Sequence, residues 1–339
     1  MAPWPMQPHL NKQQIGKISV RTSLAILVIW FAILGIALSQ RRQILDYLAL
    51  RGYSAPSAIA TLATQDGMTE NARHVFYVNK PTIESKITFG KKCPAGMAEK
   101  TIVLGCYHSN QAGIVLLSVD DPRLNGVVQV TAAHEMLHAE YDRLSTNDRN
   151  YVDGLLLDYY KNKLTNQRIK DTIDGYRKSE PNDVVNEMHS IFGTEVANLP
   201  PALETYYQRY FTDRSKVTGF AAQYETEFSS RQDAIKQDDA QLAALKKQID
   251  NLEKSLSTQQ AEISQQRSTL DAERSSGNIT AYNAGVPGYN QQVNTYNAGV
   301  HQVQALVDQY NQIVVARNAV AAEITTLSNA LSSQATTIN

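Results

Sequence analysis

Apolar residues in the last third of the chain recur at helical spacing. They repeat every seven residues from Ile235 to Leu270. From Val286 to Tyr310 they follow at alternating steps of three and four, and the series continues to Leu331. A Gly-containing break at 275–278 separates the two series. The pattern predicts a long antiparallel α-helical coiled-coil hairpin over 217–339. A heptad seam does not identify its partner, so pairing in cis and pairing in trans with another copy are both open.

A second apolar pattern lies near the N-terminus. The stretch 24–38 holds only apolar residues and glycine, and extended back to Ile18 it is about as long as a bilayer is thick. We expect a transmembrane anchor at 18–40, preceded by a cytoplasmic segment at 1–17. The alternative is a cleaved signal peptide, since Ala37-Leu38-Ser39 resembles a cleavage site. The basic pair Arg41-Arg42 directly after the stretch favours an anchor.

The region 54–216 has the mixed pattern of a globular domain. We expect extended runs at Val75–Val78, at Ile102–Cys106 and at Gly113–Val119, the last rich in branched apolar residues. Helical patterns follow, and together they predict an α+β domain with a small sheet packed on helices. The predicted helices cover 57–63, 127–144, 149–164 and 183–192, with one more after Pro200-Pro201.

Composition narrows the partners and the compartment. The 32 Lys and Arg balance 33 Asp and Glu, which leaves no basic field for a nucleic acid. The 2 cysteines, Cys93 and Cys106, cannot form a four-thiolate metal site, and their spacing suits one disulfide. A disulfide implies an oxidising compartment and so a domain outside the cytoplasm, whereas two unrelated buried thiols are the alternative. The expected protein is therefore a single-pass membrane protein with an extracytoplasmic domain.

The candidate chemistry begins at His134-Glu135-Met136-Leu137-His138, an HExxH motif in a helical setting. Side chains four apart share one helix face, so His134 and His138 can bind one Zn²⁺. Catalytic zinc lowers the pKa of a water toward 7, and Glu135 can act as the general base that takes its proton.

A third ligand is needed, because catalytic zinc sites usually hold the metal with three side chains. The metzincin extension is missing, since Tyr141 and Leu144 stand where glycine and histidine would be required. Three residues of one later stretch are candidates: Glu187, His189 and Glu195.

The HExxH helix followed by Asn186-Glu187-Met188-His189-Ser190 resembles the gluzincin, or thermolysin-like, zinc metallopeptidases over roughly 54–216. The resemblance implies a zincin-like domain, with His134, His138 and Glu187 as zinc ligands and Glu135 as general base. It also implies an edge strand that pairs with an extended substrate, for which the run 113–119 is the candidate.

The chain also departs from this family. The gap of 48 residues between His138 and Glu187 is long, and Ile191 replaces the acidic residue that follows the glutamate ligand. Several acids could therefore orient an imidazole, and several residues could donate a hydrogen bond to the transition state. The acids are Glu195, Asp183 and Asp142, and the donors are His189, Tyr206 and Tyr207.

Two functions follow. The first is a membrane-anchored zinc metallopeptidase that hydrolyses a peptide or protein substrate with a zinc-activated water, regulated or targeted by its coiled coil. The second is a membrane-tethered coiled-coil scaffold that binds partners and keeps a structural or inactive zinc site.

Overall fold

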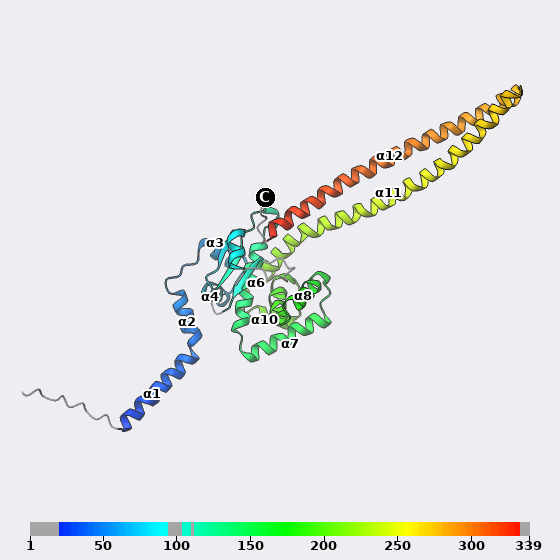
Figure 1. Cartoon of the computed structure of the whole chain (residues 1–339). Helices are drawn as coiled ribbons and strands as arrows, with labels where there is room; N and C mark the ends of the chain where they lie inside the picture. Colours follow the sequence, from blue (N-terminus) through cyan, green and yellow to red (C-terminus); the bar gives the residue numbers. More distant parts are fainter. Residues whose placement is uncertain (1–19, 94–103, 110–111, 333–339) are drawn as a thin grey trace, which may run out of the picture. The chain divides into compact units, whose positions relative to one another are not determined.

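The computed structural model describes the backbone of residues 20–93, 104–109 and 112–332 (Figure 1). The chain divides into two compact units, residues 1–55 and 56–339. The predicted cytoplasmic segment at 1–17 and the final residues of the predicted coiled coil lie outside the described residues.

The first unit contains two helices, α1 (Val20–Ser39) and α2 (Arg41–Leu50). The large apolar side chains described on α1 are exposed, among them Trp30 at 65% and Phe31 at 70%. Within the described residues no single helix passes as a membrane span by length and hydropathy, whereas Leu27–Ile36 and Arg41–Leu50 pass together across a bend of 63°. The anchor at 18–40 therefore stays a prediction.

The second unit opens with α3 (Ser57–Gln65) and α4 (Glu70–Val78). The prediction of an extended run at Val75–Val78 is wrong, because these residues form the last turns of α4. The side chain of Thr69 caps that helix by accepting a hydrogen bond from the Ala72 amide. Ala72, Val75 and Phe76 are then buried at helical spacing.

A small sheet comes next, with β1 (Thr82–Glu84), β2 (Gly105–His108) and β3 (Gly113–Leu117), and α5 (Lys86–Lys92) between β1 and β2. The strand order is β1-β3-β2, with β1 parallel and β2 antiparallel to β3. The expected edge strand at 113–119 is thus the central strand, and β2 is the edge. Of the predicted run Ile102–Cys106, the first two residues lie outside the described residues.

Helices surround the rest of this unit. A 3₁₀ turn (Pro122–Leu124) leads into α6 (Val127–Arg143), which carries the HExxH motif. The remaining helices are α7 (Thr146–Asn162), α8 (Gln167–Ser179), α9 (Val184–Glu195) and α10 (Pro201–Tyr207). Helix α8 was not predicted. At Gly193 of α9 a Cβ would lie 2.4 Å from Leu137 Cδ1, so the missing side chain lets α9 approach α6 closely.

The two longest helices, α11 (Ser215–Ser275) and α12 (Ile279–Leu331), lie side by side and reverse at Gly277, which has φ +80° (Figure 1). The predicted apolar seam of each arm therefore packs against the other arm of the same chain. A Cβ on Gly285 would lie 2.7 Å from Leu270, and one on Gly299 would lie 2.7 Å from Leu256. The sequence Tyr-Asn-Ala-Gly-Val occurs twice, at 282–286 and at 296–300, and contains these two glycines. The two copies thus make equivalent contacts in one antiparallel register.

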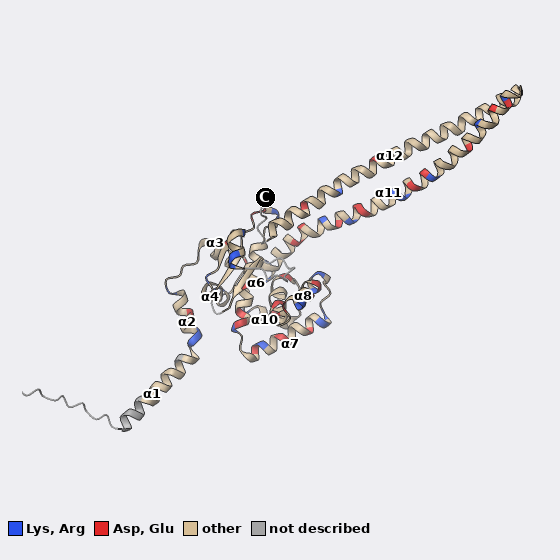
Figure 2. Cartoon of the chain, in the orientation of Figure 1, with Lys and Arg blue, Asp and Glu red and all other residues tan. Residues whose placement is uncertain are grey.

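Charge differs between the two arms of the hairpin. Figure 2 shows acidic and basic residues along α11, while α12 is almost uncharged. Two ion pairs join the arms near their base, Arg231 to Glu323 at 2.8 Å and Arg317 to Asp239 at 2.5 Å. They fix the register, although exposed pairs of this kind add little stability.

The base of the hairpin packs on the start of α6. Leu327 and Leu331 of α12 are buried against Leu124 and Val127, and Tyr224 and Phe228 of α11 pack against the same cluster. Gly126, with φ +101°, touches Phe220 of α11 at the N-terminus of α6. The globular part of this unit therefore includes both ends of the hairpin.

Candidate metal centre and cleft

Three of the predicted site residues meet at one point. Helix α6 presents His134 and His138 from successive turns, and α9 brings Glu187 to them. The Nε2 of His134 lies 3.5 Å from Glu187 Oε2, and the Nε2 of His138 lies 3.4 Å from Glu187 Oε1. One ligand atom from each residue lies within 4.8 Å of the others.

This spacing fits a tetrahedral zinc site. Two ligands bound at about 2.0 to 2.1 Å with tetrahedral angles lie about 3.3 to 3.4 Å apart. The observed separations of 3.4 and 3.5 Å match that value. Glu187 is 7% exposed, and its Oε2 has no hydrogen-bond partner among the described residues. A buried carboxylate oxygen in this state is the group that a cation would satisfy.

Burial opposes ionisation of Glu187, but His138 and His134 outweigh it and lower its pKa. The carboxylate is therefore the stable form of this residue, as metal binding requires.

Glu135 lies beside the ligands and against the edge strand. The pKa of Glu135 is raised to about 7, mainly because the carboxyl group is buried. The nearby Glu187 also raises this pKa, whereas His138 and a hydrogen bond from the Tyr107 backbone oppose the rise. A carboxyl group with a pKa near neutrality both accepts and returns protons efficiently. A Cβ on Gly105 would lie 2.7 Å from Glu135 Oε1, so β2 approaches this close only because residue 105 lacks a side chain.

The partner that orients an imidazole is Asn186, whose side-chain oxygen accepts a hydrogen bond from His138 Nδ1 at 3.0 Å. The predicted acids do not take this role. Glu195 pairs instead with Arg168 at 2.8 Å, while Asp142 and Asp183 make no hydrogen bond to either imidazole. The sequence signal for Asn186 was its place directly before Glu187, which puts the two side chains next to each other on the first turn of α9.

The predicted transition-state donors lie behind the centre. His189 is fully buried, and its Nε2 lies 3.0 Å from the Tyr206 hydroxyl. Burial, with His138 and His134 nearby, lowers the pKa of His189 to about 3. The Tyr207 hydroxyl donates to the His189 carbonyl at 2.6 Å. None of the three lines the cleft, so neither the donor role nor that of His189 as a rival ligand is supported.

A cleft of about 620 Å³ opens over the three clustered residues. Its walls are strand β2, one face of α6 and the start of α9, and Tyr224 of α11 contributes from the hairpin base. Three tyrosines that were not predicted line it: Tyr107, Tyr176 and Tyr224.

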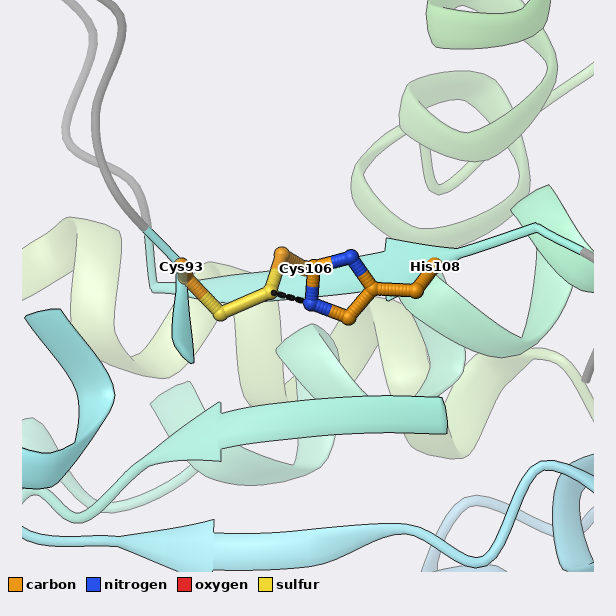
Figure 3. Close-up of side chains that lie close together, drawn as sticks. All are labelled: Cys93, Cys106 and His108. Carbon is orange, nitrogen blue, oxygen red and sulfur yellow. Dashed lines mark hydrogen bonds between the residues drawn. A yellow bond between two sulfur atoms is a disulfide. The ribbon is translucent and has the colours of Figure 1, made fainter. Parts of the chain in front are cut away.

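Cys93 and Cys106 form a disulfide, as predicted, which ties the end of α5 to β2 (Figure 3). The His108 Nε2 lies 3.3 Å from Cys106 Sγ and donates to the Lys92 carbonyl at 3.1 Å. Cys93, Cys106 and His108 lie close enough together to hold a metal ion. Cysteine binds metals as a free thiolate, however, and here the two sulfurs are bonded to each other. The group therefore serves to fix the edge strand that borders the cleft.

No family model, curated protein or solved structure matches the chain, so the function of this centre rests on its own geometry.

Proposed function

We propose that the chain is a zinc-dependent metallopeptidase. His134, His138 and Glu187 are its metal ligands, and Glu135 is its general base. The observation that carries the proposal is the convergence of both imidazole Nε2 atoms on the Glu187 carboxylate, at 3.5 and 3.4 Å, with one ligand atom of each residue within 4.8 Å of the others. The buried carboxyl group of Glu135, whose pKa is raised, lies beside them in an open cleft. The resemblance to the gluzincins supports the same roles.

Each part of the site has a task in peptide hydrolysis. A bound Zn²⁺ would act as a Lewis acid and lower the pKa of a water toward 7. Glu135 accepts the proton and delivers it to the leaving amine. Strand β2, at the edge of the sheet and along the cleft, provides backbone groups to which an extended peptide can add as a further strand.

The proposed protein is tethered to a membrane with this domain outside the cytoplasm. The apolar, exposed side chains of α1 support the tether, and the Cys93–Cys106 disulfide supports an oxidising compartment. Carbonate extraction of membranes and protease accessibility of residues 56–339 in spheroplasts test both points. Release by carbonate, or protection of the domain, would contradict them.

The deciding experiment combines metal analysis with two substitutions. The purified chain should hold one zinc and cleave an unfolded protein substrate. Glu135→Gln should keep the zinc and lose cleavage by about 10²-fold or more, because only the proton acceptor is removed. His138→Ala should lose both. Full cleavage by Glu135→Gln would refute the mechanism.

A scaffold function is the second candidate, because the hairpin arms comprise 61 and 53 residues. Removing 246–310 and closing the shortened hairpin with a Gly-Ser turn keeps the base that packs on α6 and follows the observed register. Peptidase activity that persists without the distal hairpin would assign the rod to docking or regulation. Zinc binding with no peptidase activity in either form would favour the scaffold.

A further inference from the structure

The cleft is far more acidic than the chain as a whole. Six of the described side chains that line it are carboxylic acids, and none is Lys or Arg, although the whole chain has 32 basic and 33 acidic residues. Glu135 and Glu187 belong to the reaction centre. The other four are Asp142, Glu180, Asp183 and Glu195.

Two of these acids stand at the same end of the cleft. Asp142 follows His138 by one turn of α6, and Asp183 precedes Glu187 by about one turn at the start of α9. Phe220 of α11 lies against Gly126, directly before α6, and Arg214, directly before α11, donates to the Phe192 carbonyl near the end of α9. The start of α6 and the end of α9 therefore lie together, and the two helices run antiparallel. Residues beyond His138 and before Glu187 therefore lie on one side of the metal centre.

Glu180 at this end has an interaction of its own, but Asp142 and Asp183 carry charge that no described residue neutralises. Both Asp142 and Asp183 are exposed, and neither side chain has a hydrogen bond or ion pair with a described residue. At the opposite end, Arg168 pairs with Glu195 at 2.8 Å and with Glu225 at 2.5 Å. Between them lies the buried Glu187, whose Oε2 also lacks a hydrogen-bond partner there. The cleft therefore places two negative charges that are unpaired within the described chain, those of Asp142 and Asp183, next to the candidate metal centre.

We propose that this cleft selects peptides that carry a lysine or arginine close to the scissile bond, with Asp142 and Asp183 as the specificity-determining residues. The proposal rests on the proposed peptidase function. One helical turn is about 5.4 Å, and an extended peptide advances about 3.3 to 3.6 Å per residue. The basic side chain therefore belongs to a residue within about two positions of the bond that is cut, on the Asp142 side.

The test uses the zinc-loaded full chain and paired peptides that differ only by Lys against acetyl-lysine at each position flanking the cleavage site. We expect kcat/KM to favour the Lys peptide by about tenfold at one of these positions, and less as salt rises. Asp142→Asn and Asp183→Asn should each reduce that preference about threefold to fivefold. Asp308→Asn, on the distant α12, removes the same charge and should leave it unchanged.

Binding to zinc-loaded Glu135→Gln, measured by fluorescence anisotropy, separates this proposal from the peptidase itself. Tighter binding of the Lys peptide than of the acetyl-lysine peptide, weakened by Asp142→Asn, supports the specificity. If the parent chain nevertheless cuts neither peptide, the proposed peptidase function fails while the specificity stands. Efficient cleavage with equal rates for both peptides overturns the specificity and leaves the peptidase standing. A preference for the Lys peptide that survives when Asp142→Asn and Asp183→Asn are combined also overturns the specificity.

Discussion

His138 and Asn186 are joined by a hydrogen bond of 3.0 Å between α6 and α9, the two helices that form the candidate metal centre. Because Nδ1 donates to the amide oxygen, Nε2 is left free of its proton and faces Glu187. The bond therefore sets both the tautomer and the orientation that a metal ligand needs.

Asn186→Ala should weaken zinc binding about 10- to 100-fold, since an outer partner of a ligating imidazole is removed. Competition with a chelating dye measures the change. Asn186→Asp keeps the acceptor and should retain most of the affinity, and Asn162→Ala, on the surface of α7, is the control. Unchanged affinity in Asn186→Ala would show that the contact does not orient the ring.

Gly105→Ala should reduce peptide cleavage by about tenfold or more while zinc stays bound, because the misplacement of a catalytic group is costly. The added Cβ would lie 2.6 Å from Thr131 Cγ2 and 2.7 Å from Glu135 Oε1, so Glu135 must move. Gly154→Ala, where the Cβ meets nothing within 4 Å, is the matched control. Equal activity in the two variants would mean that Glu135 tolerates the shift.

Asp66 should make the fold less stable as pH rises. Burial raises its pKa well above the ordinary value of 3.8, and neither carboxyl oxygen has a hydrogen-bond partner among the described residues. The folded chain therefore keeps a proton that the unfolded chain loses above about pH 4. The stabilising contribution of the neutral form is complete below that pH and is lost as pH rises toward the folded pKa.

Asp66→Asn removes this dependence, so its stability relative to the parent chain should be greater at pH 7 than at pH 4. Urea midpoints across that range measure it, with Asp308→Asn as a charge-matched control. Parallel midpoint curves for the parent chain and Asp66→Asn would contradict the expectation.

Cys93 and Cys106 should give no free thiols without reductant and two after reduction under denaturing conditions. Replacing both with serine should lower the free energy of unfolding by about 3 kcal/mol, because the bond closes a loop of intermediate length. Thiol titration and urea unfolding test the two statements. Two thiols titrating in the native, unreduced chain would exclude the bond.

Gly299→Leu should lower the melting temperature of the hairpin, because α11 and α12 are in contact there and a Cβ already reaches within 2.7 Å of Leu256. Gly219→Leu, on an open face of α11, should raise it or leave it unchanged, since leucine favours helix. Circular dichroism during heating compares them. Similar effects at both positions would argue against the observed register.

Local patterns were predictable from the sequence, and long-range arrangement was not. The HExxH spacing places His134 and His138 on one face in any helix, and the seam of the hairpin is equally local. The meeting of Glu187 with both imidazoles was predicted from a motif, and the geometry agrees with it. The role of Asn186 was missed, because it depends on the rotation of α9 against α6.

The errors have similar causes. Val75–Val78 is rich in β-branched and aromatic residues, but the cap at Thr69 and the burial of Phe76 make it helical. The run that became β3 looked like an exposed edge, yet strand order is set by pairing partners, and the sequence pattern does not encode it. Tyr206 and Tyr207 could not be excluded as donors until the packing around His189 was known.

The hydrophobic cluster at the base of α11 and α12 connects the hairpin to the helix that carries the candidate metal centre. The first turn of α6 packs against Leu327, Leu331 and Phe228 of the hairpin. Val127 in that turn is seven residues from His134. Because both arms pack on this one helix end, a displacement of the far tip of the hairpin would be transmitted to the start of the helix that carries His134 and His138.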